Sequence, residues 1–397
     1  MQSLKRIKLF YYGDTGENDN QSPNYAINQD FSSEVLYLLA VRDAYFYDVD
    51  RLSSQLKMDK SNLISLLETM CRIKLISQKG GFYKLEFCIF TEHDLPCFEI
   101  NLREPAKQIA SKIKNCSDLY NSIKALKYYD YFSDKRWLYH ILCDIIFDGF
   151  ALDYLENKGL FCTHKEQVGN RDYIAYGFED SDLMASASEN CLCSSNNYRT
   201  EKYVFNSFGD SAGNRNDFYR VFKRIKNGDE VQSDKLNVKA LKALLSGSTE
   251  MEIADSCGRL IEFVLNRGTF DKASDEWNLE IQALISEMGY IGENSENSQW
   301  KCTVPVFIRE DMGLIEELSQ QIMDLIYEEI TLAIQLSFES EMRLSPLNHE
   351  LSRGEIGIEL WHQLFGRINE ELILSEIVAI PCSFKGEGRY LKSFYLL

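Results

Sequence analysis

The sequence predicts a helix-rich α+β fold. Apolar residues recur every three or four positions in residues 138–146 and 314–333, which is the spacing of one buried helix face. Shorter aromatic and β-branched runs at residues 173–178 and 203–208 are flanked by Gly, Asn and Asp, as is typical of short strands. The chain of 397 residues is 45% hydrophobic and 12% aromatic and has only 6 prolines, so it has the composition of a folded protein.

The chain is long enough for two or three domains. Residues 1–30, rich in Asn, Asp, Gly and Ser after position 13, predict a flexible or partly ordered N-terminal arm. Residues 31–95 carry one compact pattern and predict a small domain. Residues 96–397 predict a larger mixed α+β body, which could comprise two subdomains with a break near residues 230–250.

Three helices are predicted at the start of the small domain. The first covers residues 35–39, and Asp48 or Asp50 can cap the second. Asp59 follows a short turn and can cap the third helix through its side-chain oxygen. The third helix has five apolar residues at the spacing of one buried face, namely Leu63, Leu66, Leu67, Met70 and Ile73.

A β-hairpin is predicted after the third helix. Residues 75–77 and 82–89 are strand-like runs on either side of Lys79-Gly80-Gly81. The two glycines suit the positive φ angles of a tight hairpin turn.

This order of three helices and a hairpin resembles the winged helix-turn-helix domains of bacterial transcription regulators, with the ArsR-like and MarR-like groups nearest. The resemblance rests on Asp48-Val49-Asp50-Arg51-Leu52 through Gly80-Gly81-Phe82. It covers about 60 residues and implies that the third helix enters the major groove while the hairpin, the wing, contacts the backbone or a minor groove.

The charge distribution favours DNA binding by this segment. The whole chain carries a net charge of -18, but residues 51–84 contain seven bases and two acids, a local charge of +5. Clustered Lys and Arg bind phosphates by releasing counterions, so a local cluster is what this mechanism requires. Residues 1–90 contain 11 bases and 11 acids, so all of the excess acid lies outside these residues and would keep the body away from DNA.

We expect the third helix to read bases and the lysines to hold phosphates. Asn62 suits a bidentate contact with adenine, and hydroxyl groups can bond several base edges. Lysines on the helix and hairpin would mainly fix the position of the protein on the backbone. The predicted DNA-binding residues are Arg51, Lys57, Lys60, Ser61, Asn62, Ser65, Thr69, Lys79 and Lys84.

The predicted function is therefore a cytoplasmic, bacterial transcription regulator that is not an enzyme. Its partner would be double-stranded DNA, and a homodimer would place two third helices in major grooves about 34–36 Å apart. The body would dimerise or sense a small-molecule or peptide effector. No cofactor is predicted. An interaction protein whose winged helix binds protein instead of DNA is an alternative.

A serine hydrolase is the alternative from another functional class. Gly209-Asp210-Ser211-Ala212-Gly213 matches Gly-x-Ser-x-Gly, in which Ser211 would be the nucleophile. Such a site needs a later histidine, and only His349 and His362 follow. His362, beside Trp361 on an apolar stripe, is more typical of a packed or hydrogen-bonded histidine. The alternating strands and helices of a hydrolase sheet are also missing, which favours a simple polar turn.

A zinc site is only weakly indicated. Cys162-x-His164 and Cys191-x-Cys193 offer four soft ligands, but paired zinc cysteines usually have two to four residues between them. The 11 cysteines are an odd number and no secretory signal is recognised, so reduced thiols in a cytosol are expected.

Three further expectations concern individual segments of the body. The most apolar stretch, residues 137–155, is interrupted by charged residues, so no membrane span is predicted. His140, Asp144 and Asp148 lie four residues apart on the polar side of this helix, as in a solvated face or a proton relay. Residues 194–197 are predicted to lie in a loop, and residues 376–397 to form two strands around a glycine turn.

Overall fold

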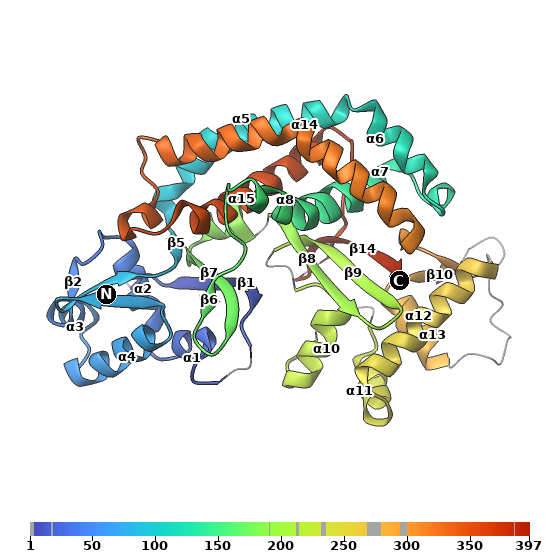
Figure 1. The fold of residues 1–397 in the computed structure, drawn as a ribbon. Helices are drawn as coiled ribbons and strands as arrows, with labels where there is room; N and C mark the ends of the chain where they lie inside the picture. Colours follow the sequence, from blue (N-terminus) through green and yellow to red (C-terminus); the bar gives the residue numbers. More distant parts are fainter. Residues whose placement is uncertain are drawn as a thin grey trace. The chain divides into compact units, whose positions relative to one another are not determined.

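A computed structural model of the protein describes residues 4–16, 19–189, 191–211, 214–231, 236–267, 279–293, 300–384 and 386–397. The fold is α+β and helix-rich, with 56% helix and 18% strand, which confirms the predicted class. The chain forms two compact units, shown in Figure 1. Unit 1 comprises Met1–Ser111, Ala151–Cys191 and Leu325–Ile368, and unit 2 comprises Lys112–Phe150, Leu192–Asp324 and Asn369–Leu397.

The first 95 residues of unit 1 contain the predicted helices and hairpin. Part of the predicted arm is a strand and part is a short helix, β1 (Ile7–Asp14) and α1 (Pro23–Ile27). The next elements are α2 (Ser32–Ala40), β2 (Tyr47–Asp48), α3 (Val49–Leu56), α4 (Lys60–Arg72), β3 (Ile76–Lys79) and β4 (Phe82–Leu85), drawn in blue in Figure 1. The three strands form an antiparallel sheet in the order β2-β4-β3.

The hairpin turn has the predicted conformation, but the second strand is shorter than expected. Gly80 and Gly81 have φ angles of 61° and 87°, which L-residues rarely adopt. The strand predicted over residues 82–89 ends at Leu85, and β5 (Cys88–Phe90) pairs in parallel with a strand of another sheet. An unbroken run of buried residues fits either sheet, so hydrophobicity alone could not locate this change of partner.

A second sheet completes the strands of unit 1. Its central strand is β7 (Arg171–Glu179), which confirms the strand predicted at residues 173–178. The order is β1-β7-β5, with β6 (Glu166–Gln167) also pairing with β7. The antiparallel register of β1 and β7 runs from Ile7 opposite Glu179 to Asp14 opposite Asp172.

One hydrophobic core joins the two sheets of unit 1. It contains the apolar faces of α2, α3 and α4, including Leu36, Leu52 and Leu63. Ile7 of β1 and Tyr173 of β7 belong to the same core. The three-helix segment therefore shares its interior with residues outside 31–95.

Long helices connect the two units in the sequence. The remaining helices that lie wholly or partly in unit 1 are α5 (Leu95–Lys114), α8 (Ala151–Asn157), α9 (Asp182–Met184), α14 (Met312–Glu339) and α15 (Arg353–Leu374), with shorter turns η1 (Glu92–Asp94), η5 (Ala185–Glu189) and η7 (Ser345–His349). Most of the stripe predicted at residues 314–333 is core, because Ile315, Leu318, Ile322, Ile326 and Ile330 are buried, whereas Leu325 of the same stripe is 37% exposed.

Unit 2 is built on a sheet of order β12-β14-β9-β8. These strands are β8 (Leu192–Arg199), β9 (Tyr203–Asp210), β12 (Val306–Ile308) and β14 (Gly388–Leu396), and β13 (Ser383–Phe384) also pairs with β14. The β13–β14 pair and β9 confirm two predictions. A separate pair is formed by β10 (Ile291–Glu293) and β11 (Trp300–Cys302).

Helices and turns supply the rest of unit 2. They are α6 (Ser117–Ser122), η2 (Ile123–Ala125), η3 (Tyr129–Tyr131), α7 (Asp134–Leu138), the π-helical η4 (Tyr139–Phe150), α10 (Phe218–Asn227), α11 (Val238–Gly247), α12 (Glu250–Arg267), α13 (Leu279–Glu287) and η6 (Arg309–Asp311). No helix in the described part of the chain has both the length and the apolar content needed to cross a membrane.

One prediction about unit 2 is wrong, and one of two alternatives offered for another segment is excluded. Residues 194–197 lie in strand β8 instead of a loop, because pairing with β9 satisfies backbone groups whatever the side chains are. The polar side of the helix at residues 138–146 is not solvated, since His140 and Asp144 are buried. The hydrogen-bond partner of Asp144 is Asn206 in β9, which the helical spacing could not reveal.

Candidate functional site

Two aspartates fix the turn between α3 and α4. Asp48 caps α3 by accepting a hydrogen bond from Arg51 N at 2.8 Å, and Asp59 caps α4 by accepting from Ser61 N at 2.8 Å and Asn62 N at 3.4 Å. Bonds from the Ser61 side chain and these amides lower the pKa of Asp59. Lys57 ends α3 with a φ of 53°. The predicted caps are therefore present, and they set where α4 begins.

Helix α4 has one face in the core and one face at the surface. Leu63, Leu66, Leu67 and Met70 are buried. The exposed side carries four of the predicted DNA-binding residues, which we call the α4 face: Lys60, Ser61, Asn62 and Ser65. Thr69 is only partly exposed, and its hydroxyl donates to Ser65 O at 3.0 Å.

The bases near the α4 face differ in how they are held. Lys60 forms an exposed ion pair with Asp50 at 2.7 Å, and this bond raises the pKa of Lys60. The Arg51 guanidinium donates to Phe46 O at 2.7 Å and lies 5.1 Å from the Phe46 ring centroid. Lys57 and Lys79 are exposed and form no ion pair within the described residues. Among the predicted DNA-binding residues, they are the bases most available to an anionic partner.

Lys84 is placed differently from the other predicted DNA-binding residues. Its side chain is 14% exposed and lies 3.4 Å from Glu86 and 3.7 Å from Glu350. Its Nζ also approaches the His349 carbonyl at 3.5 Å. These contacts hold Lys84 inside unit 1 and away from the α4 face.

His349 connects the hairpin to α2. The Leu85 N–H donates to His349 Nδ1 at 3.2 Å, and His349 Nε2 donates to Leu39 O at 3.0 Å. Burial lowers the pKa of His349 to about 4, so the ring is neutral at neutral pH. Because both ring nitrogens are engaged, His349 has no acceptor left for the proton of a catalytic serine.

His362 is a packed histidine, as the sequence predicts. It is buried in unit 1, its Nδ1 lies 2.8 Å from Ile358 O, and its ring stacks on Tyr12 at 4.3 Å. Burial lowers its pKa to about 4.

The segment around Ser211 has a structural explanation. Ser211 follows β9, while Ala212 and Gly213 lie outside the described residues. A Cβ atom at Gly209 would lie 2.1 Å from the Arg389 carbonyl of β14, so this glycine permits the close approach of two strands. Both neighbours of β9 are antiparallel to it, unlike the parallel central strands of a hydrolase elbow.

The four zinc-site candidates do not form one set. Among the described residues, no group of three or more His, Cys, Asp and Glu side chains is arranged to hold a metal ion. His164 is exposed and bonds Asp172 at 2.8 Å, which raises its pKa, while Cys191 is buried. All eleven cysteines, Cys162 and Cys193 included, lie in the described residues and form no disulfide bond there.

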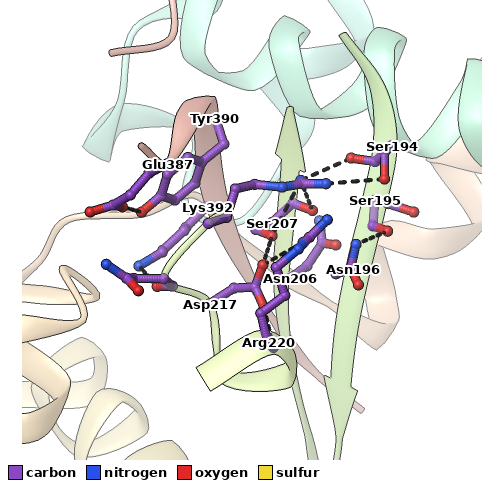
Figure 2. Close-up of polar contacts among 12 residues, drawn as sticks. Ser194, Ser195, Asn196, Asn206, Ser207, Asp217, Arg220, Glu387, Tyr390 and Lys392 are labelled. Carbon is purple, nitrogen blue, oxygen red and sulfur yellow. Dashed lines mark hydrogen bonds and ion pairs between the residues drawn. The ribbon is translucent and has the colours of Figure 1, made fainter. Parts of the chain in front are cut away.

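A buried polar cluster in unit 2 was missed by sequence reasoning (Figure 2). We call it the Arg215 cluster. Arg215 is fully buried and donates from Nη1 to the carbonyls of Ser194 at 2.9 Å and Ser207 at 3.1 Å. Its Nη2 donates to Ser194 Oγ at 3.0 Å. Burial lowers the pKa of Arg215 to about 10. This pKa is still well above neutral pH, so the guanidinium stays charged there.

Asp217 provides the negative charge of the Arg215 cluster. It accepts from Ser207 Oγ and from Arg220 Nη1, each at 2.8 Å, and also caps α10 through Arg220 N (Figure 2). Residues 215–226 contain five bases and one acid. This high density of basic residues is the signal in the sequence that could have indicated a polar cluster.

The side chains around β8 bond its backbone. The Ser195 N–H donates to Asp148 at 2.8 Å, and Asn369 donates to the Leu192 carbonyl at 2.7 Å. Arg215 adds the bond to the Ser194 carbonyl. Since β8 is the last strand in its sheet, these bonds satisfy groups at an edge, which is a structural role.

His140 and Asp144 are likewise parts of the interior, and Asp148 on the same helix is half-buried. Asp144 accepts from Asn206, which also donates to Ser393 Oγ at 2.9 Å. Burial lowers the pKa of His140 and raises the pKa of Asp148 to about 7. His140 Nδ1 lies 3.8 Å from Asp144 Oδ2.

Comparisons with protein families, with curated proteins and with solved structures found no match to the chain.

Proposed function

We propose that the protein is a DNA-binding transcription regulator of bacterial cytoplasm in which residues 31–95 act as a winged helix. The exposure of the α4 face carries this proposal. Helix α4 fills the core with its apolar side and presents Lys60, Ser61, Asn62 and Ser65 at the surface. A recognition helix needs both properties, because it must be held by the domain while its polar side enters a groove.

The position of the polar residues along α4 supports base reading. Ser61 and Asn62 lie in the first turn, directly after the Asp59 cap. Recognition helices contact base edges mainly with residues near the N-terminus. Asn62 is suited to adenine, and the serine hydroxyls can donate to or accept from several bases.

The basic residues best suited to phosphate contacts are those that form no ion pair within the described residues, although Lys79 also lies 5.8 Å from the Tyr45 ring centroid. Lys57 lies in the turn before α4, and Lys79 lies at the end of β3, beside the hairpin turn. Lys60 would leave its ion pair with Asp50 and bind a phosphate instead. This change would cost little free energy, because ion pairs at the surface are weak. Lys84 is excluded from the proposed interface by its contacts inside unit 1.

The rest of the chain would supply dimerisation or effector sensing. In a homodimer, two α4 helices would contact the same side of the duplex. The 50 acids and 32 bases of residues 91–397 would repel phosphates and limit contact to the basic segment.

Selection of bound sequences from random duplex DNA, followed by salt titration, tests the proposal. The double variant Lys57→Gln/Lys79→Gln should bind the selected DNA more weakly and lower the slope of log K against log salt by about 2, at about 0.9 per lost phosphate contact. The matched control Lys107→Gln/Lys114→Gln removes two exposed lysines from α5 and should leave the slope unchanged.

The variant Asn62→Ala separates base reading from phosphate binding. It should reduce the preference for the selected sequence and keep the salt slope of the native protein, because a neutral side chain releases no counterion. Selection without sequence enrichment, or equal slopes for the two lysine double variants, would rule out this interface.

A further inference from the structure

The exposed side of α14 within unit 1 carries a line of leucines. Leu325, Leu332 and Leu336 are 37%, 49% and 40% exposed, although the other side of the helix is core. Spacings of seven and four residues place them within about 20° of one line along the helix. We call this line the α14 seam, and it is about 16 Å long at 1.5 Å per residue.

Acidic residues flank the α14 seam. Helix α14 contains six acids and no base along its whole length. At 100° per residue, Glu328 and Glu339 lie on one side of the leucines and the half-buried Glu329 lies on the other. Glu328 and Glu339 are exposed and form no ion pair within the described residues. An apolar line between carboxylates is the pattern of a helix surface that pairs with another helix.

The nearby bases approach α14 from other sides. Lys158 lies 5.5 Å from the Tyr327 ring centroid, and Arg353 lies 5.1 Å from that of Phe338. Tyr327 and Phe338 each lie two positions after a seam leucine, and residues two apart do not share a helix face. The charge at the seam is therefore not neutralised by these two bases.

We infer that the α14 seam binds an amphipathic helix of a partner protein whose leucine-like apolar line is flanked by Lys or Arg. The apolar line supplies the contact area, and the flanking charges select the partner. Pairing with α14 of a second copy would place carboxylates against carboxylates, which is unfavourable. The inference does not depend on DNA binding.

Two synthetic peptides test the partner chemistry. Both have the same heptad leucine line, one with lysines and the other with glutamates at the flanking positions. The lysine peptide should bind the full chain in fluorescence anisotropy, whereas the glutamate peptide should not bind.

The double variant Leu332→Glu/Leu336→Glu distinguishes seam binding from simple charge attraction. It should weaken lysine-peptide binding by about tenfold or more, although it makes the surface more acidic. Leu183→Glu/Leu374→Glu is the control, because these leucines are exposed outside the α14 seam. It should leave the affinity unchanged. Circular dichroism should give the same helix content for both variants, and Leu332→Ser provides a milder second test.

Three outcomes would overturn the inference. The lysine peptide could fail to bind, or it could bind the seam variant as tightly as or more tightly than the native chain. Sedimentation equilibrium could also show a dimer of the native chain that Leu332→Glu/Leu336→Glu converts to monomer, in which case the occupant would be a second copy.

Discussion

Glu359 is the clearest single group that links pH to the stability of unit 1. The side chain is buried and accepts hydrogen bonds from the Tyr12 hydroxyl and from Gln363 Nε2 at 2.9 Å. Burial raises the pKa of Glu359 to about 7 from an ordinary value of 4.5. The folded protein therefore binds a proton more tightly than the unfolded chain does at this position.

The sign of the pH dependence follows from this raised pKa. The stabilisation by protonated Glu359 is complete below the unfolded pKa of 4.5 and is lost as the pH rises through about 7. The side chain in Glu359→Gln is neutral at every pH, so this variant does not lose that stabilisation as the pH rises. Its free energy of unfolding relative to the native protein should increase between pH 5 and pH 8, by up to about 3 kcal/mol.

Urea titrations at several pH values measure this difference. The native curve also contains the contribution of Asp148, which has a raised pKa in unit 2, so the difference between variant and native protein is the informative quantity. Glu104→Gln, an exposed neutralisation on α5, is the control and should run parallel to the native protein. If the free energy of unfolding of Glu359→Gln also ran parallel to that of the native protein across this pH range, the expectation would be contradicted.

Single-residue roles were predictable where they are local. Asp59 and the two hairpin glycines act on backbone within three residues, so the sequence around them contained the necessary information. His140 and Asp144 were misjudged because Asn206, the partner of Asp144, lies 62 residues away. Helical spacing describes which residues share a face but not what covers that face.

At the level of elements, the α4 cap makes a measurable contribution. Asp59→Ala removes the acceptor for Ser61 N and Asn62 N and should lower the free energy of unfolding by about 1 kcal/mol. Asp59→Ser keeps a capping oxygen and should lose less. Urea denaturation followed by circular dichroism checks both, and equal stability of all three proteins would show that the cap is unimportant.

Periodicity correctly predicted two long helical stripes and two strands. The stripes at residues 138–146 and 314–333 are helical, and the aromatic runs became β7 and β9. Strand β8 was missed because its side chains are polar and its stability comes from pairing with β9 and from bonds to Asp148, Arg215 and Asn369. Strand β9 follows β8 directly, but Asp148, Arg215 and Asn369 lie farther away in the sequence.

For the whole molecule, the boundaries of the proposed winged helix extend beyond residues 31–95. Its core includes Ile7 and Tyr173, and its hairpin is bonded to His349. A fragment of residues 1–95 should therefore lack cooperative unfolding, because Tyr173 and His349 are missing from it. Thermal circular dichroism of the fragment and of the full chain makes the comparison. A sharp transition for the fragment at the temperature of the full chain would show an autonomous domain.

The candidate DNA-binding residues could be selected from sequence, but their availability could not. Composition and capping placed Ser61 and Asn62 on α4. Only the structure shows that Lys84 is held by Glu86 and Glu350 and that Lys60 is paired with Asp50. Such pairings depend on tertiary contacts between elements distant in the sequence.

The bond from His349 to the hairpin also affects when the protein becomes complete during translation. A ribosome synthesises the chain from its N-terminus, so Leu39 and Leu85 emerge more than 260 residues before the histidine that bonds both. A nascent chain, or a product truncated before residue 349, has no imidazole for these two backbone groups. Only molecules that extend past residue 349 can thus finish assembling this part of the N-terminal segment.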